Sequence, residues 1–221
     1  MDFQILSVLE PAQVDQILGE LQRCSFIDGK ATAQGIARDV KNNLQANRAA
    51  TDLNIPDEVV RSALFANQTF QAFAFPRRIR QPLFSRYERG MNYGSHVDAS
   101  IFNDNGSLLR ADLAVTVFLS PPDTYDGGEL VIELPYGEEE IKLQAGEAIV
   151  YSAGSVHRVA PVTRGVRMAA VTWVQTAVQD ERMRALLFDL YRATKQVEAR
   201  QDPTLLLSRT YNNLLRMVSE F

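Results

Sequence analysis

The chain has 221 residues, of which 46% are hydrophobic and 23% are charged, proportions that are ordinary for a soluble globular protein. This length predicts one large domain, or one domain with a small appendage. Lysine and arginine number 23 against 27 acidic residues, for a formal charge of −4. Because there is no basic excess or basic stripe, we expect no nucleic-acid partner.

Cysteine content and hydropathy indicate the cellular compartment in which the protein is expected to work. Cys24 is the single cysteine, so an intrachain disulfide is excluded and a reducing compartment is favoured. The first residues lack the basic and apolar regions of a signal peptide. No stretch approaches the roughly 18 apolar residues that a membrane span requires. We therefore expect a cytoplasmic protein with no membrane contact.

The first 80 residues or so favour helices. Pro11 suits the first turn of a helix that runs to about Leu21, and Pro56 similarly opens a second one, since proline at that position costs no hydrogen bond. Residues 29–50 are polar, and their structure is ambiguous.

The middle of the chain, from about residue 82 to 175, changes to short β-rich segments. Glycine and proline turn signals separate them. The predicted strands are 112–119, 128–134, 140–144, 147–151 and 166–174. Many short strands at this spacing favour a sandwich or jelly roll over alternating strands and helices.

The third part is helical again. Residues 182–197 and 205–220 each carry an apolar stripe, and we expect the two helices to pack on each other and on the barrel. Their stripe would also allow two copies of the chain to pair. The pattern divides the chain into a jelly-roll domain with N-terminal helices, residues 1–178, and a C-terminal helical segment, residues 179–221.

A candidate metal site begins with His96 and Asp98. In a strand, residues two apart project from the same face, so this imidazole and carboxylate would be able to grip one ion. Alone the pair is weak evidence, because 27 of the 221 residues are acidic and a surface histidine near an acid is common.

His157, the other of the two histidines, strengthens this interpretation. It follows a predicted strand and a turn of small residues, and it would enter a hairpin that turns near residues 161–165. In a jelly roll the late strands lie beside the early ones, so His157 would reach His96 and Asp98. Two histidines and one carboxylate match the facial triad of non-haem Fe(II) oxygenases. The alternative for His157 is a buried, hydrogen-bonded core histidine.

Arg167 follows ten residues after His157 and would lie almost opposite it across that turn. It shares a strand face with Ala169, Val171 and Trp173, and a buried arginine needs an anionic partner. A dicarboxylate would supply that partner through a bidentate fork; a salt bridge to one of the protein's own acids is the alternative.

Other polar residues near the candidate site fit it less well. Arg158 should point away from the face of His157, and Arg164 should lie in the turn. Tyr87 and Tyr93 precede His96; either phenol would be able to donate a hydrogen bond inside the barrel, although aromatic strand residues are often plain core.

The joint pattern resembles the Fe(II)/2-oxoglutarate dioxygenases related to prolyl 4-hydroxylases, and most closely the bacterial PKHD-type hydroxylases. H-x-D, a distal histidine and an arginine ten residues later carry the resemblance, which covers nearly the whole chain. Further matching pieces are VKNN (40–43), PLFSRYERGMNYGSHVDAS (82–100), DLAVTVFLSPPDTYDGGELVI (112–132), LLFDL (186–190) and YNNLLR (211–216).

The resemblance implies a double-stranded β-helix that uses Fe(II) and 2-oxoglutarate, with L-ascorbate as a reductant of the iron. The iron ligands carried over are His96, Asp98 and His157. Arg167 carries over as the clamp for 2-oxoglutarate, and Tyr87 as the tyrosine that helps hold its distal carboxylate. One departure is Phe26, where the family pattern leads us to expect a tryptophan near the substrate mouth.

The implied reaction is hydroxylation of a small-molecule or peptidyl substrate, coupled to oxidative decarboxylation of 2-oxoglutarate to succinate and CO₂. We expect lids over the site at residues 99–110 and 120–128. Two alternatives remain at this point. One is a cupin-like metalloenzyme that does not use 2-oxoglutarate and gives Arg167 no special task; the other is a non-catalytic jelly-roll binding module.

Overall fold

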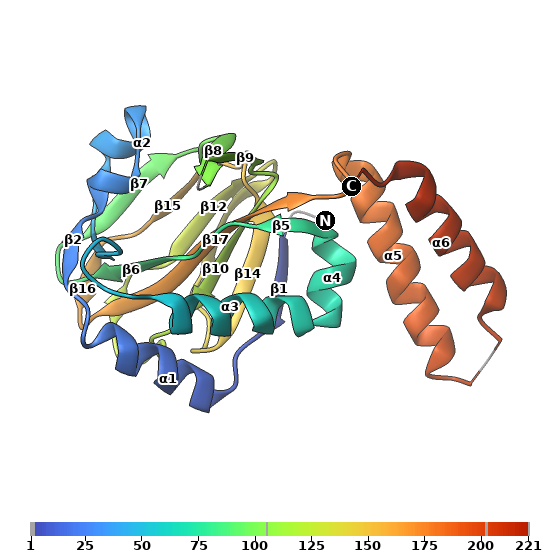
Figure 1. Ribbon diagram of the computed structural model, residues 1–221, viewed down its shortest axis with the longest axis horizontal. Helices are drawn as coiled ribbons and strands as arrows, with labels where there is room; N and C mark the ends of the chain where they lie inside the picture. Colours follow the sequence, from blue (N-terminus) through green and yellow to red (C-terminus); the bar gives the residue numbers. More distant parts are fainter. Residues whose placement is uncertain (1–2, 105, 202, 221) are drawn as a thin grey trace.

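The computed structural model describes residues 3–104, 106–201 and 203–220. Two mostly antiparallel sheets face each other at the centre of the molecule, and helices lie at its edges (Figure 1). The sheets form a sandwich with a cavity between them and do not close into a barrel. A mainly β protein with flanking helices is thus what the sequence predicted.

The larger sheet is built from segments that lie far apart in the chain. Its strands, in spatial order, are β1 (Phe3–Ser7), β14 (Glu147–Ser152), β10 (Leu113–Phe118), β17 (Arg167–Thr176), β6 (Leu83–Tyr87), β4 (Leu44–Ala46) and β2 (Phe26–Asp28), with β5 (Pro76–Ile79) pairing to the far end of β17. The long strand β17 lies near its middle, so the side chains on one face of β17 point into the sandwich.

The smaller sheet carries the two histidines. Its strands, in spatial order, are β13 (Gly137–Ile141), β12 (Leu130–Leu134), β15 (His157–Val159), β7 (Asn92–His96) and β3 (Lys41–Asn42). Two short ribbons complete the strands: β11 (Asp126–Gly127) with β16 (Val162–Arg164), and β8 (Ile101–Asp104) with β9 (Ser107–Arg110).

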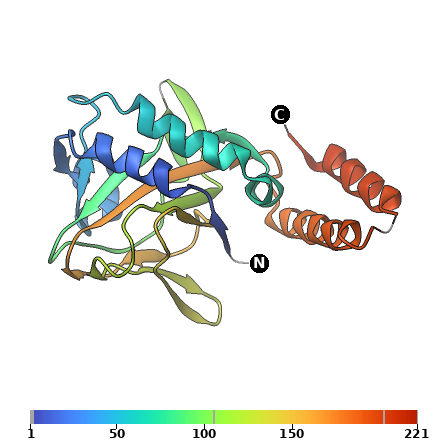
Figure 2. The ribbon, with the colours of Figure 1, turned by 90° about the horizontal axis from the view of Figure 1, so that it is seen from below.

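Three helices cover the outer face of the larger sheet: α1 (Pro11–Leu21), α3 (Asn54–Ala66) and α4 (Gln68–Ala74). Figure 2 shows α1 and α3 side by side across that face. The sheet is therefore buried on both sides. In β10, Val115 and Val117 pack under the helices while Ala114 and Phe118 belong to the core between the sheets, which explains why the strand is apolar at nearly every position.

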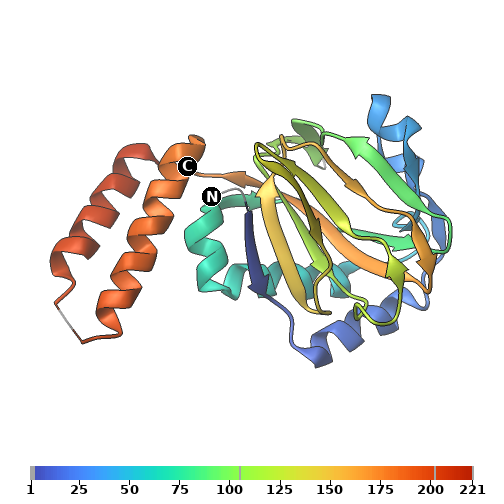
Figure 3. The same ribbon diagram turned by 180° about the vertical axis from the view of Figure 1, so that it is seen from behind.

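The C-terminal helices α5 (Glu181–Glu198) and α6 (Leu205–Val218) form a pair beside the sandwich (Figures 1 and 3). They pack on each other as predicted. Besides α6, α5 packs on α4, where Phe188 meets Phe73 edge to face, and residues of α5 line a surface pocket together with residues of β1. The expected packing of both helices on the sheets stays a prediction. The domain division after residue 178, and the pairing of two copies through these helices, stay predictions.

Two further expectations about the strands are corrected. The first 80 residues contain β1 to β5 as well as helices. These strands have only two to five residues each, too few to show a period in the sequence. The predicted hairpin between His157 and Arg167 does not form: β15 pairs with β12 and β7, whereas β17 pairs with β10, β6 and β5. The intervening residues form β16 and carry the chain from one sheet to the other.

Within the described parts of the chain, none of the helices is both long and apolar enough to cross a lipid bilayer.

Candidate active site

Three side chains predicted to bind a metal converge in the sandwich. His157 on β15 stands directly opposite His96 at the end of β7. Asp98 lies just beyond the end of β7, where its carboxylate reaches within 3.8 Å of Nε2 of each histidine. Candidate ligand atoms of all three residues lie within 4.8 Å of one another, so this cluster is able to hold a metal ion. Asp98 departs from the prediction in one respect, because it follows the strand and is not part of it.

The hydrogen bonds of the two rings prepare both histidines as ligands. Nδ1 of His96 lies 2.8 Å from the Gly94 carbonyl, and Nδ1 of His157 lies 3.0 Å from the Ser155 carbonyl. Because a carbonyl only accepts, each Nδ1 carries the proton and each Nε2 keeps its lone pair facing Asp98. Burial, and next the charge of His157, lower the pKa of His96 to about 4. His96 is therefore neutral at pH 7, as a metal ligand must be.

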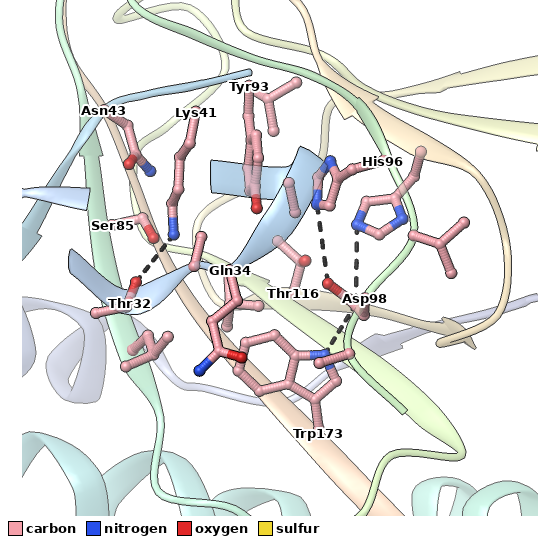
Figure 4. Close-up of a pocket in the computed structure, with 18 of the residues that line it drawn as sticks. Thr32, Gln34, Lys41, Asn43, Ser85, Tyr93, His96, Asp98, Thr116 and Trp173 are labelled. Atoms are coloured by element: carbon pink, nitrogen blue, oxygen red, sulfur yellow. Dashed lines mark hydrogen bonds and ion pairs between the residues drawn. The ribbon is translucent and has the colours of Figure 1, made fainter. Parts of the chain in front are cut away.

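Neighbouring aromatic side chains fix this geometry. Trp173 on β17 donates a hydrogen bond of 2.8 Å from Nε1 to Oδ2 of Asp98, and Figure 4 shows the three side chains of His96, Asp98 and Trp173 side by side. Tyr93 stacks on His96 with ring centroids 3.6 Å apart. The alternation of side chains along residues 166–174 already placed Trp173 on the same strand face as Arg167. Nothing in the sequence indicated that Trp173 would donate a hydrogen bond to Asp98.

Removing the indole hydrogen bond should weaken the metal site without dismantling it. We expect Trp173→Phe to lower the affinity for Mn(II) or Fe(II) about 10-fold or more, because the partners that orient a ligand typically contribute that much. Titration of the apoprotein with Mn(II), followed by electron paramagnetic resonance, measures the effect. Tyr125→Phe is the control, since it also removes a buried polar atom, but from a residue that lies next to Arg167; equal losses in the two variants would contradict a specific role for Trp173.

Arg167 is the largest fully buried side chain of the described residues. It begins β17, opposite Tyr87 on β6, and its guanidinium lies about 5 Å from the ring centroids of both Tyr87 and Phe118 (5.2 and 5.1 Å). Gly128 makes this packing feasible, because a Cβ there would lie 3.0 Å from Cδ of Arg167. Burial raises the pKa of Tyr87, against the opposing effect of Arg167, so the phenol stays protonated and able to donate.

The alternative of an internal salt bridge for Arg167 finds no support. Its Nε and Nη2 are buried without a hydrogen-bond partner among the described residues. Arg158 and Arg164, by contrast, form ion pairs with Glu138 and Asp126, each at 2.6 Å, near the surface. Since an unpaired buried cation is costly, Arg167 is suited to an anionic ligand that enters the cavity.

A cavity of about 720 Å³ connects the histidine–aspartate cluster with Arg167, a volume typical of small-molecule sites. Besides the two sheets, it is lined by β8 and by residues from the short helices η1 (Gly29–Thr32) and α2 (Gly35–Asp39). Four residues of the predicted lid at 99–110 line the cavity, namely Ala99, Ile101, Phe102 and Asn103, whereas residues 120–128 and Phe26 do not line it.

The residues that line the cavity fit both Fe(II) and 2-oxoglutarate, the two groups that the sequence resemblance implies. Two imidazole nitrogens and one carboxylate oxygen on one side of a cavity are the donor set of non-haem Fe(II) sites with open positions. The unpaired guanidinium at the other side offers the fork that a carboxylate accepts. Sequence reasoning missed Lys41, Thr32 and Gln34, which also line the cavity, because residues 29–50 have no periodic pattern.

Comparisons with known proteins agree with this chemistry. Residues 82–175 match the family model of the 2OG-Fe(II) oxygenase superfamily. A PKHD-type hydroxylase of Synechococcus elongatus is 44% identical, with 100% of both chains covered, and one of Burkholderia ambifaria is 45% identical, with 98% of both covered.

Solved structures confirm the jelly-roll fold. A prolyl-4-hydroxylase of Pseudomonas putida matches with a TM-score of 0.55 and 19% identity, over 79% of this chain and 92% of that one. A prolyl hydroxylase of Trichoplax adhaerens, solved with a peptide of hypoxia inducible factor, matches with a TM-score of 0.58 and 18% identity, over 84% of this chain and 86% of that one.

The relatives that match over the full length decide between the functions that the sequence left open. They exclude both the cupin-like metalloenzyme and the non-catalytic binding module. The need for ascorbate stays a prediction. The chain belongs to the PKHD-type hydroxylases of the 2OG-Fe(II) oxygenase superfamily, and is an oxidoreductase that uses Fe(II) and 2-oxoglutarate.

Proposed function

We propose that this enzyme hydroxylates a C–H bond of a small-molecule or peptidyl substrate, with His96, Asp98 and His157 as the iron ligands and Arg167 and Tyr87 as the residues that hold 2-oxoglutarate. One oxygen atom of O₂ enters the product hydroxyl group and the other enters succinate, while CO₂ is released. The observation that carries the proposal is the buried, unpaired Arg167 in the same cavity as the three candidate ligands.

The cluster of His96, Asp98 and His157 supports an iron site that keeps positions open. Three protein ligands on one side leave room for a bidentate co-substrate and for O₂. The bound iron would supply the activation of O₂ that organic side chains cannot perform. The protein contributes orientation: the Nδ1 hydrogen bonds to Gly94 and Ser155 fix both rings, and Trp173 fixes the carboxylate.

Arg167 and Tyr87 support a co-substrate with a distal carboxylate. Nε and Nη2 of Arg167 would donate to the two oxygens of one carboxylate, and the protonated Tyr87 phenol is available as a further donor. The guanidinium is buried beside the Phe118 ring, and the low local dielectric would strengthen these hydrogen bonds. The enclosure also keeps water away from the reacting atoms, so that an oxidising species is spent on the substrate and not on the protein.

Binding and turnover of 2-oxoglutarate test the proposed function directly. Under anaerobic conditions, 2-oxoglutarate added to the Fe(II)-loaded protein should produce a visible metal-to-ligand absorption band. Admission of O₂ should then yield succinate slowly in the absence of a prime substrate, and omission of iron should stop it. A fully metallated protein that neither binds 2-oxoglutarate by calorimetry nor forms succinate would refute the assignment of Arg167 and the triad.

A further inference from the structure

Lys41 is a buried cation that the proposed reaction leaves unused. It lies on β3 and is 5% exposed, and it lines the same cavity as the triad and Arg167. From the position of Lys41, and on the basis of the function proposed above, we propose that the prime substrate carries a carboxylate that binds to the Lys41 ammonium.

The surroundings of Lys41 leave its ammonium able to bind a further group. It donates a hydrogen bond of 3.0 Å to Oγ1 of Thr32 and lies 5.1 Å from the ring centroid of Tyr93. In the described parts of the chain it forms no ion pair with a carboxylate. An ammonium has three N–H donors, so capacity for an incoming acceptor remains. Figure 4 shows the amine beside Thr32 and Ser85, across the pocket from Asp98.

The charges of the loaded site also favour an anionic substrate. The positive charges of Fe(II) and Arg167 together balance the carboxylate of Asp98 and the two carboxylates of 2-oxoglutarate. Lys41 then remains as a buried positive charge that nothing in the loaded site balances. Burial lowers the pKa of Lys41 to about 8, against the opposing effects of Asp98 and Asp28. A bound carboxylate would reverse that desolvation cost, because an opposite charge stabilises the ammonium.

The Asn43 amide near Lys41 and the single charge of the lysine suit a carboxylate better than a phosphate. The Asn43 side chain is buried, lines the cavity and lies beside the Tyr87 phenol. Its Nδ2 would donate to the second oxygen of a carboxylate whose first oxygen accepts from Lys41. A phosphate dianion would leave one negative charge unmatched at a single lysine. Arg80 also lines the cavity, but its guanidinium stacks on Phe102, 4.5 Å from the ring centroid.

A paramagnetic probe of the site tests this inference without a known substrate. The protein is loaded with Mn(II), which replaces Fe(II), and saturated with 2-oxoglutarate. Acetate labelled with ¹³C is the carboxylate probe, N-acetyl-aspartate N-methylamide is its peptide-like counterpart, and inorganic phosphate is the comparison. We expect both carboxylates to show enhanced relaxation by Mn(II), and phosphate to show less.

Lys41→Met removes the charge while it keeps the length of the side chain, and it should weaken binding of both carboxylates about 10-fold or more, as the loss of a charged hydrogen bond does. Lys30→Met is the matched control, because Lys30 is an exposed lysine of the adjacent η1 helix and should leave the enhancement unchanged. The carboxylate probe that binds more tightly indicates whether the prime substrate is a small acid or a peptide.

Three outcomes would overturn the inference: no enhancement in the unmodified protein, equal enhancement in Lys41→Met, or a preference for phosphate. Enhancement that survives in Lys41→Met would mean that acetate binds the metal directly. Failure of the proposed function is distinguishable, because it would appear earlier, as a failure of Mn(II) or 2-oxoglutarate to bind. If Mn(II) and 2-oxoglutarate bind normally but the relaxation of the carboxylate probes does not depend on Lys41, only the proposed binding of a substrate carboxylate is refuted.

Discussion

His157→Ala and Asp98→Ala are each expected to abolish tight Fe(II) binding while the protein stays folded. Each variant reduces a three-ligand site to two ligands, and the two that remain cannot enclose the ion from one side. The Asp98 variant also removes the only carboxylate within 4 Å of either histidine among the described residues. Iron content after anaerobic loading, with circular dichroism and thermal unfolding as the check on the fold, measures the outcome.

Asp126→Ala provides the matched control for this experiment. Asp126 is an exposed acid whose carboxylate pairs with Arg164 and does not line the cavity, so its loss should not change iron occupancy. Retention of one full equivalent of iron in both His157→Ala and Asp98→Ala would mean that the metal binds elsewhere. The cluster would then be an ordinary arrangement of hydrogen-bonded core histidines.

The framework around the metal cluster was accessible from sequence through its longest strands, although the candidate ligands themselves lie on or just after the short strands β7 and β15. DLAVTVFL and VRMAAVTWV are apolar over their whole length, as strands covered on both faces must be, and they became β10 and β17. The pairing of an early with a late strand in a jelly roll then brought His157 opposite His96. Spacing along the chain was sufficient for this part of the site.

The position of Arg167 could not be predicted from spacing along the chain. Counting residues across the turn put it beside His157 in one hairpin, whereas it lies in the other sheet. Both arrangements give the same alternation of inward and outward side chains, so parity alone cannot choose between them. The choice depends on β16, which pairs with β11 and carries the chain across the sandwich.

The wall formed by residues 29–43 was not predictable in the same way. Its short helices and strands have no hydrophobic period, and they are held by side-chain contacts such as the hydrogen bond of Lys41 to Thr32. Contacts of this kind join residues that are adjacent only after folding. The sequence therefore indicated the iron centre more fully than it indicated the walls that would contact a prime substrate.

Arg167→Lys is expected to raise the KM for 2-oxoglutarate about 10- to 100-fold, because a hydrogen bond to a charged group contributes roughly 1.5–3 kcal/mol. Lysine keeps the positive charge but loses the planar fork that binds both carboxylate oxygens. It also loses the flat group that packs between the rings of Tyr87 and Phe118. Succinate formation at varied 2-oxoglutarate concentration gives KM, and calorimetry with the Mn(II)-loaded protein gives the affinity directly.

Arg158→Lys is the control for the same substitution at a site without a role in catalysis. Arg158 precedes Val159 on β15 and pairs with Glu138 at the surface, so its replacement should leave KM unchanged. Iron affinity should be unaffected in both variants, since neither residue belongs to the triad. If KM stays constant in Arg167→Lys, or rises equally in both variants, then the guanidinium of Arg167 is a structural cation, and the distal carboxylate of 2-oxoglutarate must bind to another group in the cavity.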